Sequence, residues 1–247
     1  MSPRPLSGHS PHPIRTRTEP MALDTAALHP RAVESASCPS LHDGDLFAGC
    51  PELIGSPSTF ARDEEIYGED EDAEFVYKVM TGAVRTYKIL GDGRRQITGF
   101  HLPGDLFGFE PGEVCGHTAE AICDTRVVVF RRRQIERVAA ARAEVAVQLW
   151  GLATRDLSQA QHHMLLLGRG SAQERVAAFL LAVGERLGST GSVALPMTRR
   201  DIADYLGLTL ETVSRTISQL EGAGALVRAG ARQVTLRRGR MRRLTEE

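Results

Sequence analysis

Apolar residues of the segment 146–167 recur at alternating intervals of four and three, and this spacing constrains the fold more than any other feature of the chain. The residues in the series are Ala146, Trp150, Ala153, Leu157, Ala160, Met164 and Leu167. This is the a/d seam of a coiled coil, and it predicts one long helix over residues 134–167. A second apolar stripe runs beside it, formed by Val145, Leu149 and Leu152. We expect one stripe to pack on a neighbouring domain and the seam on a second copy of the chain. The alternative is one wide stripe buried in a single core.

The segment before this helix has the texture of a β-domain. Short runs rich in β-branched and aromatic residues alternate with glycine turns, and the clearest runs are 75–80, 83–90, 94–100 and 126–130. The step from Asp92 to Gly93 suits the tight turn of a hairpin. Many short strands joined by Gly and Pro turns predict a sandwich, jelly roll or small barrel over residues 41–133.

The N-terminal residues 1–40 differ in composition from the rest of the chain. They contain seven of the 12 prolines and no periodic apolar pattern, so we expect a disordered tail. The chain contains no apolar run long enough to span a bilayer, and its N-terminus lacks the apolar region of a secretory signal. The four cysteines, Cys38, Cys50, Cys115 and Cys123, are too few for a disulfide scaffold and indicate a reducing cytoplasm.

The formal net charge of −1 hides an uneven distribution of charge. Residues 168–247 contain 13 arginines and eight acidic residues, a net charge of +5, whereas residues 1–167 carry a net charge of −6. Such a sign change separates a basic part that suits nucleic acid from an acidic part that does not.

The basic part contains two short helical patterns joined by a glycine. Thr198 and Thr209 are candidate N-caps, and Gly207 suits a left-handed turn between the helices. The predicted inner faces consist of Ile202, Ala203 and Leu206 on the first helix and Leu210, Val213, Ile217 and Leu220 on the second. The pattern predicts a helix-turn-helix in a domain spanning residues 168–247. The alternative is an exposed helix face in a helical bundle.

The second helix of this motif is the expected reading element, because the N-terminal residues of such a helix enter the major groove of DNA. Arg215 has the forked guanidinium that binds guanine, Glu211 can accept a hydrogen bond from cytosine, and Ser214 can make a smaller base contact. The candidate phosphate contacts of the motif are Thr198, Arg199, Thr212 and Ser218.

Residues 226–236 have the pattern of a β-hairpin, which makes the motif a winged helix-turn-helix. Arg228 and Arg232 of this hairpin are then expected near the DNA backbone. The C-terminal tail adds sequence-independent attraction to DNA through Arg237, Arg238, Arg240, Arg242 and Arg243.

The order of a β-roll, a long helix and a winged helix-turn-helix resembles the Crp/Fnr family of bacterial transcription regulators over roughly residues 41–240. The string from Leu206 to Arg215, LGLTLETVSR, is similar to the Fnr branch, and with Gly230-Ala231-Arg232-Gln233 it is similar to the FixK group. The resemblance implies an α+β fold without enzyme activity. Its parts are a cyclic-nucleotide-binding-like β-roll (a double-stranded jelly roll), a long dimerisation helix and a winged helix-turn-helix.

The resemblance also implies roles for individual residues. In the Fnr branch the Glu, Ser and Arg of Glu-x-x-Ser-Arg read the half-site, so Glu211, Ser214 and Arg215 inherit that role. The implied target is a palindrome resembling TTGAT-N4-ATCAA, bound by a homodimer that contacts RNA polymerase and acts mainly as an activator. The implied genes serve microaerobic respiration, denitrification or nitrogen fixation.

The segment 103–121 matches the place where cyclic-AMP-binding members of the family hold phosphate, but it departs from their pattern. Those members use a Glu after Gly-Asp-x-x-Gly and an Arg-Ser/Thr-Ala triplet, whereas Phe109 and His117-Thr118-Ala119 stand at these places here. Without the Arg, no side chain of the triplet can pair bidentately with a phosphate. Members of the FixK group typically lack a ligand site, so we expect neither a cofactor nor a metal.

Two other functional classes stay open at this point. Oxygen-sensing members hold an iron–sulfur cluster on closely spaced N-terminal cysteines, whereas Cys38 and Cys50 are twelve residues apart, although four cysteines equal the ligand count of a cluster. A haem on His117, His162 or His163 is a variant of this class. The other class is a cupin-like metal enzyme, but the spacing of His101 and His117 does not provide the His cluster that it needs.

Overall fold

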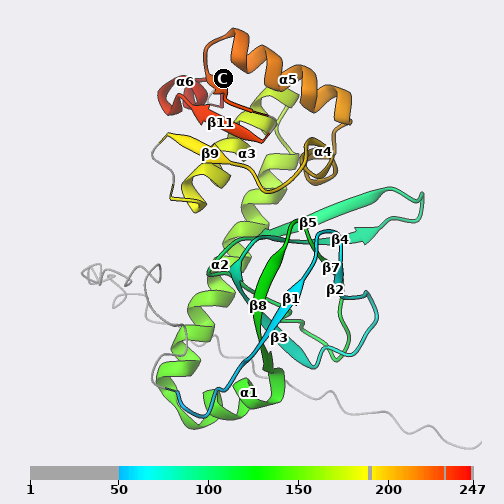
Figure 1. Cartoon of the computed structure of the whole chain (residues 1–247), viewed down its shortest axis with the longest axis vertical. Helices are drawn as coiled ribbons and strands as arrows, with labels where there is room; N and C mark the ends of the chain where they lie inside the picture. The colour runs from blue at the N-terminus through cyan, green and yellow to red at the C-terminus, as the bar shows by residue number, and fades with distance from the viewer. Residues whose placement is uncertain (1–49, 189–190, 231, 246–247) are drawn as a thin grey trace, which may run out of the picture. The chain divides into compact units, whose positions relative to one another are not determined.

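The computed structural model describes residues 50–188, 191–230 and 232–245. The tail predicted for residues 1–40, and Cys38 with it, lies outside the described residues. The described part has the α+β architecture expected from the sequence, with a β-domain followed by helices and a C-terminal domain (Figure 1). None of the helices in these described ranges is both long and apolar enough to cross a membrane.

The β-domain consists of two antiparallel four-stranded sheets (Figure 1). One sheet has the order β1-β8-β3-β6 and contains β1 (Ser56–Phe60), β3 (Phe75–Thr81), β6 (Leu106–Phe107) and β8 (Thr125–Arg131). The other has the order β2-β7-β4-β5 and contains β2 (Glu65–Tyr67), β4 (Val84–Ile89), β5 (Arg95–His101) and β7 (Thr118–Ala121). The four strand runs predicted from the sequence are therefore confirmed as β3, β4, β5 and β8. Gly93 has the positive φ expected in the β4–β5 turn, 83°.

Aromatic rings from both sheets fill part of the interior of the β-domain. The ring centroids of Tyr77 and Phe107 are 5.1 Å apart, those of Tyr67 and Tyr77 are 5.5 Å apart, and His101 stacks on Phe107 at 5.0 Å. Burial raises the pKa of Tyr77 to about 12 and lowers the pKa of His101 to about 4. Both side chains are therefore neutral at pH 7 and pack as uncharged rings.

The single helix predicted for residues 134–167 is two helices in the structure. α1 spans Arg132–Ala141 and α2 spans Ala143–Leu167, and Arg142 between them is extended with φ −131° and ψ 109°. Ile135 of α1 and Leu152 of α2 belong to the same buried cluster on the β-domain. One straight helix would hold these two residues about 25 Å apart. The break at Arg142 therefore lets both helices pack on the same surface.

The C-terminal domain contains a helix-turn-helix and a three-stranded sheet of order β10-β11-β9. Its elements are α3 (Ala172–Arg186), β9 (Ser192–Ala194), α4 (Arg199–Leu206), α5 (Leu210–Gly222), β10 (Leu226–Arg228), β11 (Gln233–Leu236) and α6 (Arg238–Arg243). The predicted hairpin is the β10–β11 pair. Four of the five arginines of the C-terminal tail lie in α6, whose Met241 is completely buried, and Arg237 precedes the helix.

One buried cluster joins the β-domain to the C-terminal domain. Ile97 and Phe100 of β5 belong to the same cluster as Phe179 of α3 and Leu206 of α4. The Phe100 ring centroid lies 6.0 Å from that of Phe179 and 5.1 Å from that of Tyr205. The two domains thus share a continuous apolar core.

Gly82, in the turn between β3 and β4, is a glycine whose replacement we expect to be costly. It has φ +88°, and an added Cβ would lie 2.4 Å from Thr125 Oγ1 and 2.6 Å from the carbonyl oxygen of Asp124. The Thr125 hydroxyl is held by hydrogen bonds with the backbone of Ala83, so it cannot retreat freely. Gly82→Ala should lower the free energy of unfolding by about 2–4 kcal/mol, measured by urea denaturation.

Gly91→Ala in the β4–β5 turn is the matched control. A Cβ there meets nothing within 4 Å, and Gly91 is not among the residues with positive φ. We expect its effect to stay within about 0.5 kcal/mol. Equal losses of stability in the two variants would contradict the steric explanation.

Candidate nucleic-acid interface

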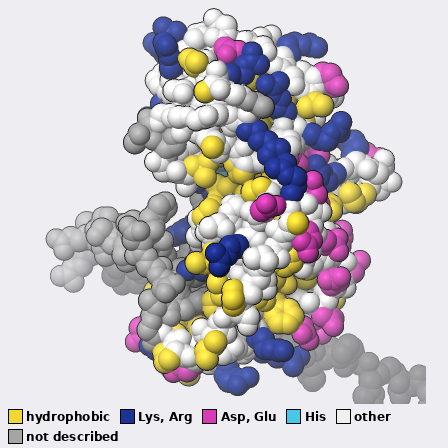
Figure 2. Space-filling model, in the orientation of Figure 1, with side chains coloured by type: hydrophobic (Ala, Val, Ile, Leu, Met, Phe, Trp, Pro, Cys, Tyr) yellow, Lys and Arg dark blue, Asp and Glu magenta, His cyan; other side chains and the backbone are white. Residues whose placement is uncertain are grey.

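Opposite charges gather on different parts of the molecule. On the face shown in Figure 2, many Lys and Arg side chains lie over the C-terminal domain and others lie lower on the molecule, whereas most of the Asp and Glu side chains on this face lie on the β-domain. This agrees with the net charges of the two parts of the sequence. Since DNA is a polyanion, the C-terminal domain is the electrostatically favoured side for it.

The helix-turn-helix is held by the caps that the sequence predicts. The Thr198 hydroxyl accepts a hydrogen bond from the backbone N–H of Asp201 at 3.1 Å, and the Asp201 carboxylate accepts one from the Thr198 N–H at 2.9 Å, which completes a capping box. Gly207 is left-handed with φ 63°. The Thr209 hydroxyl accepts a hydrogen bond from the N–H of Thr212 at 3.1 Å and so begins α5.

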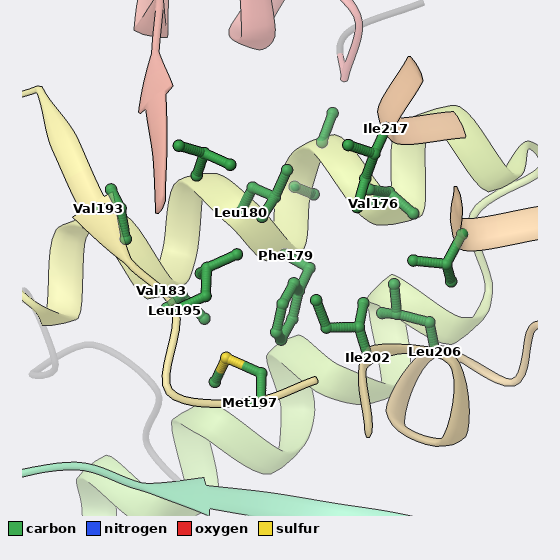
Figure 3. Packing of buried hydrophobic residues seen from close by; sticks show 14 of the residues in the cluster. Val176, Phe179, Leu180, Val183, Val193, Leu195, Met197, Ile202, Leu206 and Ile217 are labelled. Carbon is green, nitrogen blue, oxygen red and sulfur yellow. The ribbon is translucent and has the colours of Figure 1, made fainter. Parts of the chain in front are cut away.

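The inner faces of α4 and α5 pack on α3. In Figure 3, Ile202, Leu206 and Ile217 point toward Phe179 and Val176 of α3. The prediction for α5 needs two adjustments: Leu210 is only half-buried, whereas Thr216, a polar residue, is buried. Because the inner face is occupied in this way, the opposite face of α5 remains at the surface.

The three predicted base-reading residues lie on this outer face of α5. Glu211 and Arg215 are exposed and Ser214 is half-buried. Among the residues that the structure describes, no hydrogen bond or ion pair engages the Arg215 guanidinium. The side chain therefore keeps all its donors for an external partner.

Glu211 occupies the first turn of α5, where the partial positive charge of a helix N-terminus stabilises an anion. A hydrogen bond from its own backbone N–H and one from the Thr209 side chain lower the pKa of the Glu211 carboxyl, and Arg200 lowers it further. Glu211 is therefore an ionised hydrogen-bond acceptor at neutral pH. Arg200 is exposed and lines a groove together with Glu211. It directly follows Arg199, but no sequence pattern marked it as a candidate DNA contact.

Four of the predicted phosphate contacts lie together. Side chains of Thr198, Arg199, Arg228 and Arg232 line one hollow of about 250 Å³ between α4 and the β10–β11 hairpin. Two of the arginines have partners within the chain, since Arg228 Nε donates to Glu221 at 2.6 Å and Arg232 Nη1 donates to the Pro196 carbonyl at 3.3 Å.

The hydroxyl side chains named as phosphate contacts take part in local hydrogen bonds. The Thr198 hydroxyl donates to Asp201 at 2.6 Å, and the hydroxyls of Thr212 and Thr209 lie 3.0 Å apart. Ser218 donates to the Ser214 carbonyl at 3.2 Å on the exposed side of α5. Arg240 of α6 donates to the Ala223 carbonyl, which places α6 at the C-terminal end of α5 rather than at its reading end.

The two stripes of α2 have opposite environments. Val145 and Leu152 are buried against the β-domain, and Leu149 packs beside them, which confirms that one stripe packs on the neighbouring domain. The seam is mostly at the surface: Trp150 is 75% exposed, Leu157 59% and Met164 64%. Ala146, Ala153 and Ala160 are exposed as well, whereas Leu167 at the end of the seam is half-buried. A single core that buries both stripes is therefore ruled out for this chain.

The three described cysteines lie in three different buried clusters. Cys50 belongs to the cluster under α1, Cys115 to the cluster around Tyr67, and Cys123 borders the cluster that joins the two domains. Within the described ranges, no three His, Cys, Asp or Glu side chains are grouped to hold a metal, His101 and His117 included. The described cysteines do not converge on an iron–sulfur site.

The segment that corresponds to a phosphate site is surrounded by carboxylates. The Thr118 hydroxyl accepts a hydrogen bond from the Glu69 N–H at 3.1 Å, and Lys88 pairs with the Glu69 carboxylate at 2.8 Å. Burial lowers the pKa of His117, while Glu110 and Glu69 act on it in the opposite direction. A phosphate at this place would meet negative charge and no arginine of the triplet.

Each of the two domains matches a known protein family. Residues 57–142 match the cyclic nucleotide-binding domain, and residues 174–244 match the Crp-like helix-turn-helix domain. The chain is 49% identical over 197 residues to the nitrogen fixation regulation protein FixK of Azorhizobium caulinodans, covering 77% of this chain and 79% of that protein. It is also 49% identical over 174 residues to the transcriptional activatory protein AadR of Rhodopseudomonas palustris, covering 69% and 73%.

The fold is similar to solved structures as well. The structure of FixK2 from Bradyrhizobium japonicum matches with a TM-score of 0.75 and 55% identity, covering 78% of this chain and 98% of that chain. These relatives are transcription regulators, not enzymes, which removes the cupin-like enzyme as an alternative. With a ligand-binding-type β-domain, a Crp-like helix-turn-helix and close FixK relatives, the chain belongs to the Crp/Fnr family of DNA-binding transcription regulators and is FixK-like within it.

Proposed function

We propose that this FixK-like regulator works as a homodimer that reads a palindrome resembling TTGAT-N4-ATCAA and binds it without a small-molecule cofactor. Glu211, Ser214 and Arg215 read the bases, and side chains around the hollow between α4 and the β10–β11 hairpin contact phosphates. It acts mainly as an activator in the cytoplasm, together with RNA polymerase, on genes of microaerobic respiration, denitrification or nitrogen fixation. The relatives support this assignment, since one is a nitrogen fixation regulation protein and another a transcriptional activatory protein.

The observation that carries the proposal is the outer face of α5. An exposed arginine without an intramolecular partner among the described residues, Arg215, lies one turn after an ionised carboxylate, Glu211, at the N-terminal end of a capped helix. A carboxylate directed at phosphates would weaken binding, whereas it can accept a hydrogen bond from the amino group of cytosine. The pair therefore suits base edges in the major groove better than the backbone.

The homodimer is supported by the exposed seam of α2. Trp150, Leu157 and Met164 repeat at heptad spacing on one helix face, and their exposure would be unfavourable in water. A second copy of α2 has the complementary pattern by symmetry, since a two-fold interface uses the same surface twice. A palindrome in turn requires two reading helices, about one helical turn of DNA apart.

Cofactor-free binding is supported by the interior of the β-domain. Rings of Tyr67, Tyr77 and Phe107 pack in the space between the sheets, and the carboxylates of Glu110 and Glu69 lie near His117 in the segment that corresponds to the phosphate site of other members. The dispersal of Cys50, Cys115 and Cys123 over three clusters likewise argues against an iron–sulfur cluster held by these residues. The β-domain then serves as a scaffold that presents surface to RNA polymerase.

Arg215→Ala is expected to weaken binding to the palindrome by about 1–3 kcal/mol and to relax base preference at the contacted position, because the bidentate contact to guanine is lost. Fluorescence anisotropy with the palindrome, single-base variants and scrambled DNA measures both effects. Arg199→Ala is the contrast: removal of a phosphate contact should weaken binding to all sequences alike and reduce the salt slope by about 1. The base-reading role is wrong if Arg215→Ala weakens palindrome and scrambled DNA equally.

Leu157→Asp should convert the dimer into a monomer, because a carboxylate in an apolar seam loses its hydration without gaining a partner. We expect the dimer to dissociate about 100-fold more easily, measured by analytical ultracentrifugation across a concentration series. Ser158→Asp is the matched control, since Ser158 is the adjacent residue, is exposed and lies off the seam. A Leu157→Asp protein that remains dimeric at wild-type concentrations would place the interface elsewhere.

The purified protein should be colourless and should bind the palindrome in air with the same affinity in the presence and absence of cyclic AMP. The reason is that neither the triplet at His117–Ala119 nor the dispersed cysteines offers a ligand site. An absorbance spectrum of anaerobically purified protein, followed by DNA binding with and without air, checks this expectation. A brown preparation that bleaches in air would support the iron–sulfur alternative instead.

A further inference from the structure

A buried carboxylate of the helix-turn-helix is paired with arginines of the β-domain. Asp201 of α4 is 1% exposed, and its Oδ1 accepts hydrogen bonds from Arg85 of β4 at 3.2 Å and from Arg95 of β5 at 2.8 Å. Its other oxygen accepts the capping hydrogen bonds from Thr198. Both oxygens of this carboxylate are therefore used, one within the motif and one by the β-domain.

The arginine of β5 also reaches the next turn of α4. Arg95 Nε donates to Asp204 Oδ2 at 2.9 Å, so its guanidinium bridges two carboxylates on the same face of α4. Arg85 in turn pairs with Asp63 at 3.0 Å and with Glu120, both in the β-domain. We refer to Arg85, Arg95, Asp201 and Asp204 as the Asp201 cluster.

The Asp201 cluster lies beside the apolar contact between the domains. The Tyr205 ring on α4 packs against Phe100 at 5.1 Å and against His163 of α2 at 3.8 Å. Gln96 beside Arg95 donates to the Tyr205 carbonyl at 3.4 Å. Apolar packing alone tolerates sliding, because the hydrophobic effect is non-directional. Ion pairs that are also hydrogen bonds require a particular geometry and so define one orientation.

We propose that Arg95 is a positioning residue for DNA binding: through Asp201 and Asp204 it fixes the orientation of α4 and α5 on the β-domain and thereby sets the half-site spacing that the dimer accepts. This inference rests on the proposed palindrome-reading function. Arg95 acts through α4 and not through DNA, because its side chain is 22% exposed and its guanidinium is already bound to two carboxylates. The positions of the two α5 helices relative to their dimer axis then depend on the Asp201 cluster.

A direct phosphate contact by the β4–β5 hairpin is the competing explanation. Arg94 and Arg95 line the same groove as Arg200 and Glu211, about 720 Å³ in volume. Arg94, however, is 75% exposed and pairs within its own hairpin with Asp92 at 2.7 Å. The two neighbouring arginines thus carry the same charge at nearly the same place, and only Arg95 contacts α4 carboxylates.

Arg95→Gln and Arg94→Gln form a matched pair for the test. Each removes one positive charge from the β4–β5 hairpin, so both change long-range attraction to DNA equally. Affinities are measured by fluorescence anisotropy for palindromes with four, five and six spacer base pairs and for scrambled DNA. Each added base pair rotates one half-site by about 35° relative to the other.

We expect Arg95→Gln to weaken binding to the four-base-pair palindrome about 5- to 100-fold, with a smaller change on the longer spacers, so that spacing selectivity falls. Arg94→Gln should keep the wild-type selectivity. The inference is overturned if Arg95→Gln retains wild-type affinity and selectivity, or if both variants lose affinity equally on all DNAs, which would indicate a charge effect. A wild type that does not prefer the palindrome over scrambled DNA would instead refute the proposed function.

A second measurement tests the Asp201 cluster without DNA. Labels introduced as non-natural amino acids at exposed Arg126 of the β-domain and Gln219 of α5 report the distance distribution between the domains. Arg95→Gln should broaden this distribution, and Arg94→Gln should leave it unchanged. Asp204→Asn removes the same ion pair from the other side and should reproduce the broadening, whereas Arg95→Lys should restore part of the wild-type distribution. An unchanged distribution in both Arg95→Gln and Asp204→Asn would show that apolar packing alone sets the orientation.

Discussion

The ion pairs of the buried Asp201 carboxylate are the interactions on which the arrangement of the two domains depends. A carboxylate that is almost completely buried needs ion-pair and hydrogen-bond partners, and Asp201 obtains its partners from both domains. Its contact with Thr198 begins α4, and its contact with Arg85 and Arg95 attaches α4 to the β-domain. The local signal for a helix start and the long-range signal for domain placement therefore reside in one side chain.

The helix α2 makes the second connection, because one of its two apolar stripes packs on the β-domain and the other lies at the surface. Val145 and Leu152 commit one side of the helix to the β-domain, which leaves Trp150, Leu157 and Met164 on the other side. His163 near its end stacks on Tyr205 of α4, so the helix that carries the seam also contacts the reading domain. α2 and α4 are thus joined by packed side chains as well as by the polypeptide chain.

Features encoded by neighbouring residues could be predicted from the sequence, and features that join distant residues could not. The caps at Thr198 and Thr209, the left-handed Gly207 and the alternating strands follow from local chemistry, and the structure contains all of them. The break at Arg142 has no Gly or Pro to mark it and exists because two helices must pack on one cluster. Likewise, the pairing of Arg95 with Asp201 joins residues 106 positions apart, for which no periodicity exists.

The pairing of Arg85 and Arg95 with α4 carboxylates also reduces the negative charge that the C-terminal domain presents. Asp201 and Asp204 are two of the eight acidic residues in the C-terminal part, and both are neutralised by arginines. Glu221, a third, is paired with Arg228 at the edge of the hairpin. The β-domain, although acidic overall, thus contributes positive charge where α4 would otherwise carry unpaired carboxylates. Glu211 then remains as the ionised acid at the N-terminal end of α5, where the proposed base-reading role uses it as a hydrogen-bond acceptor.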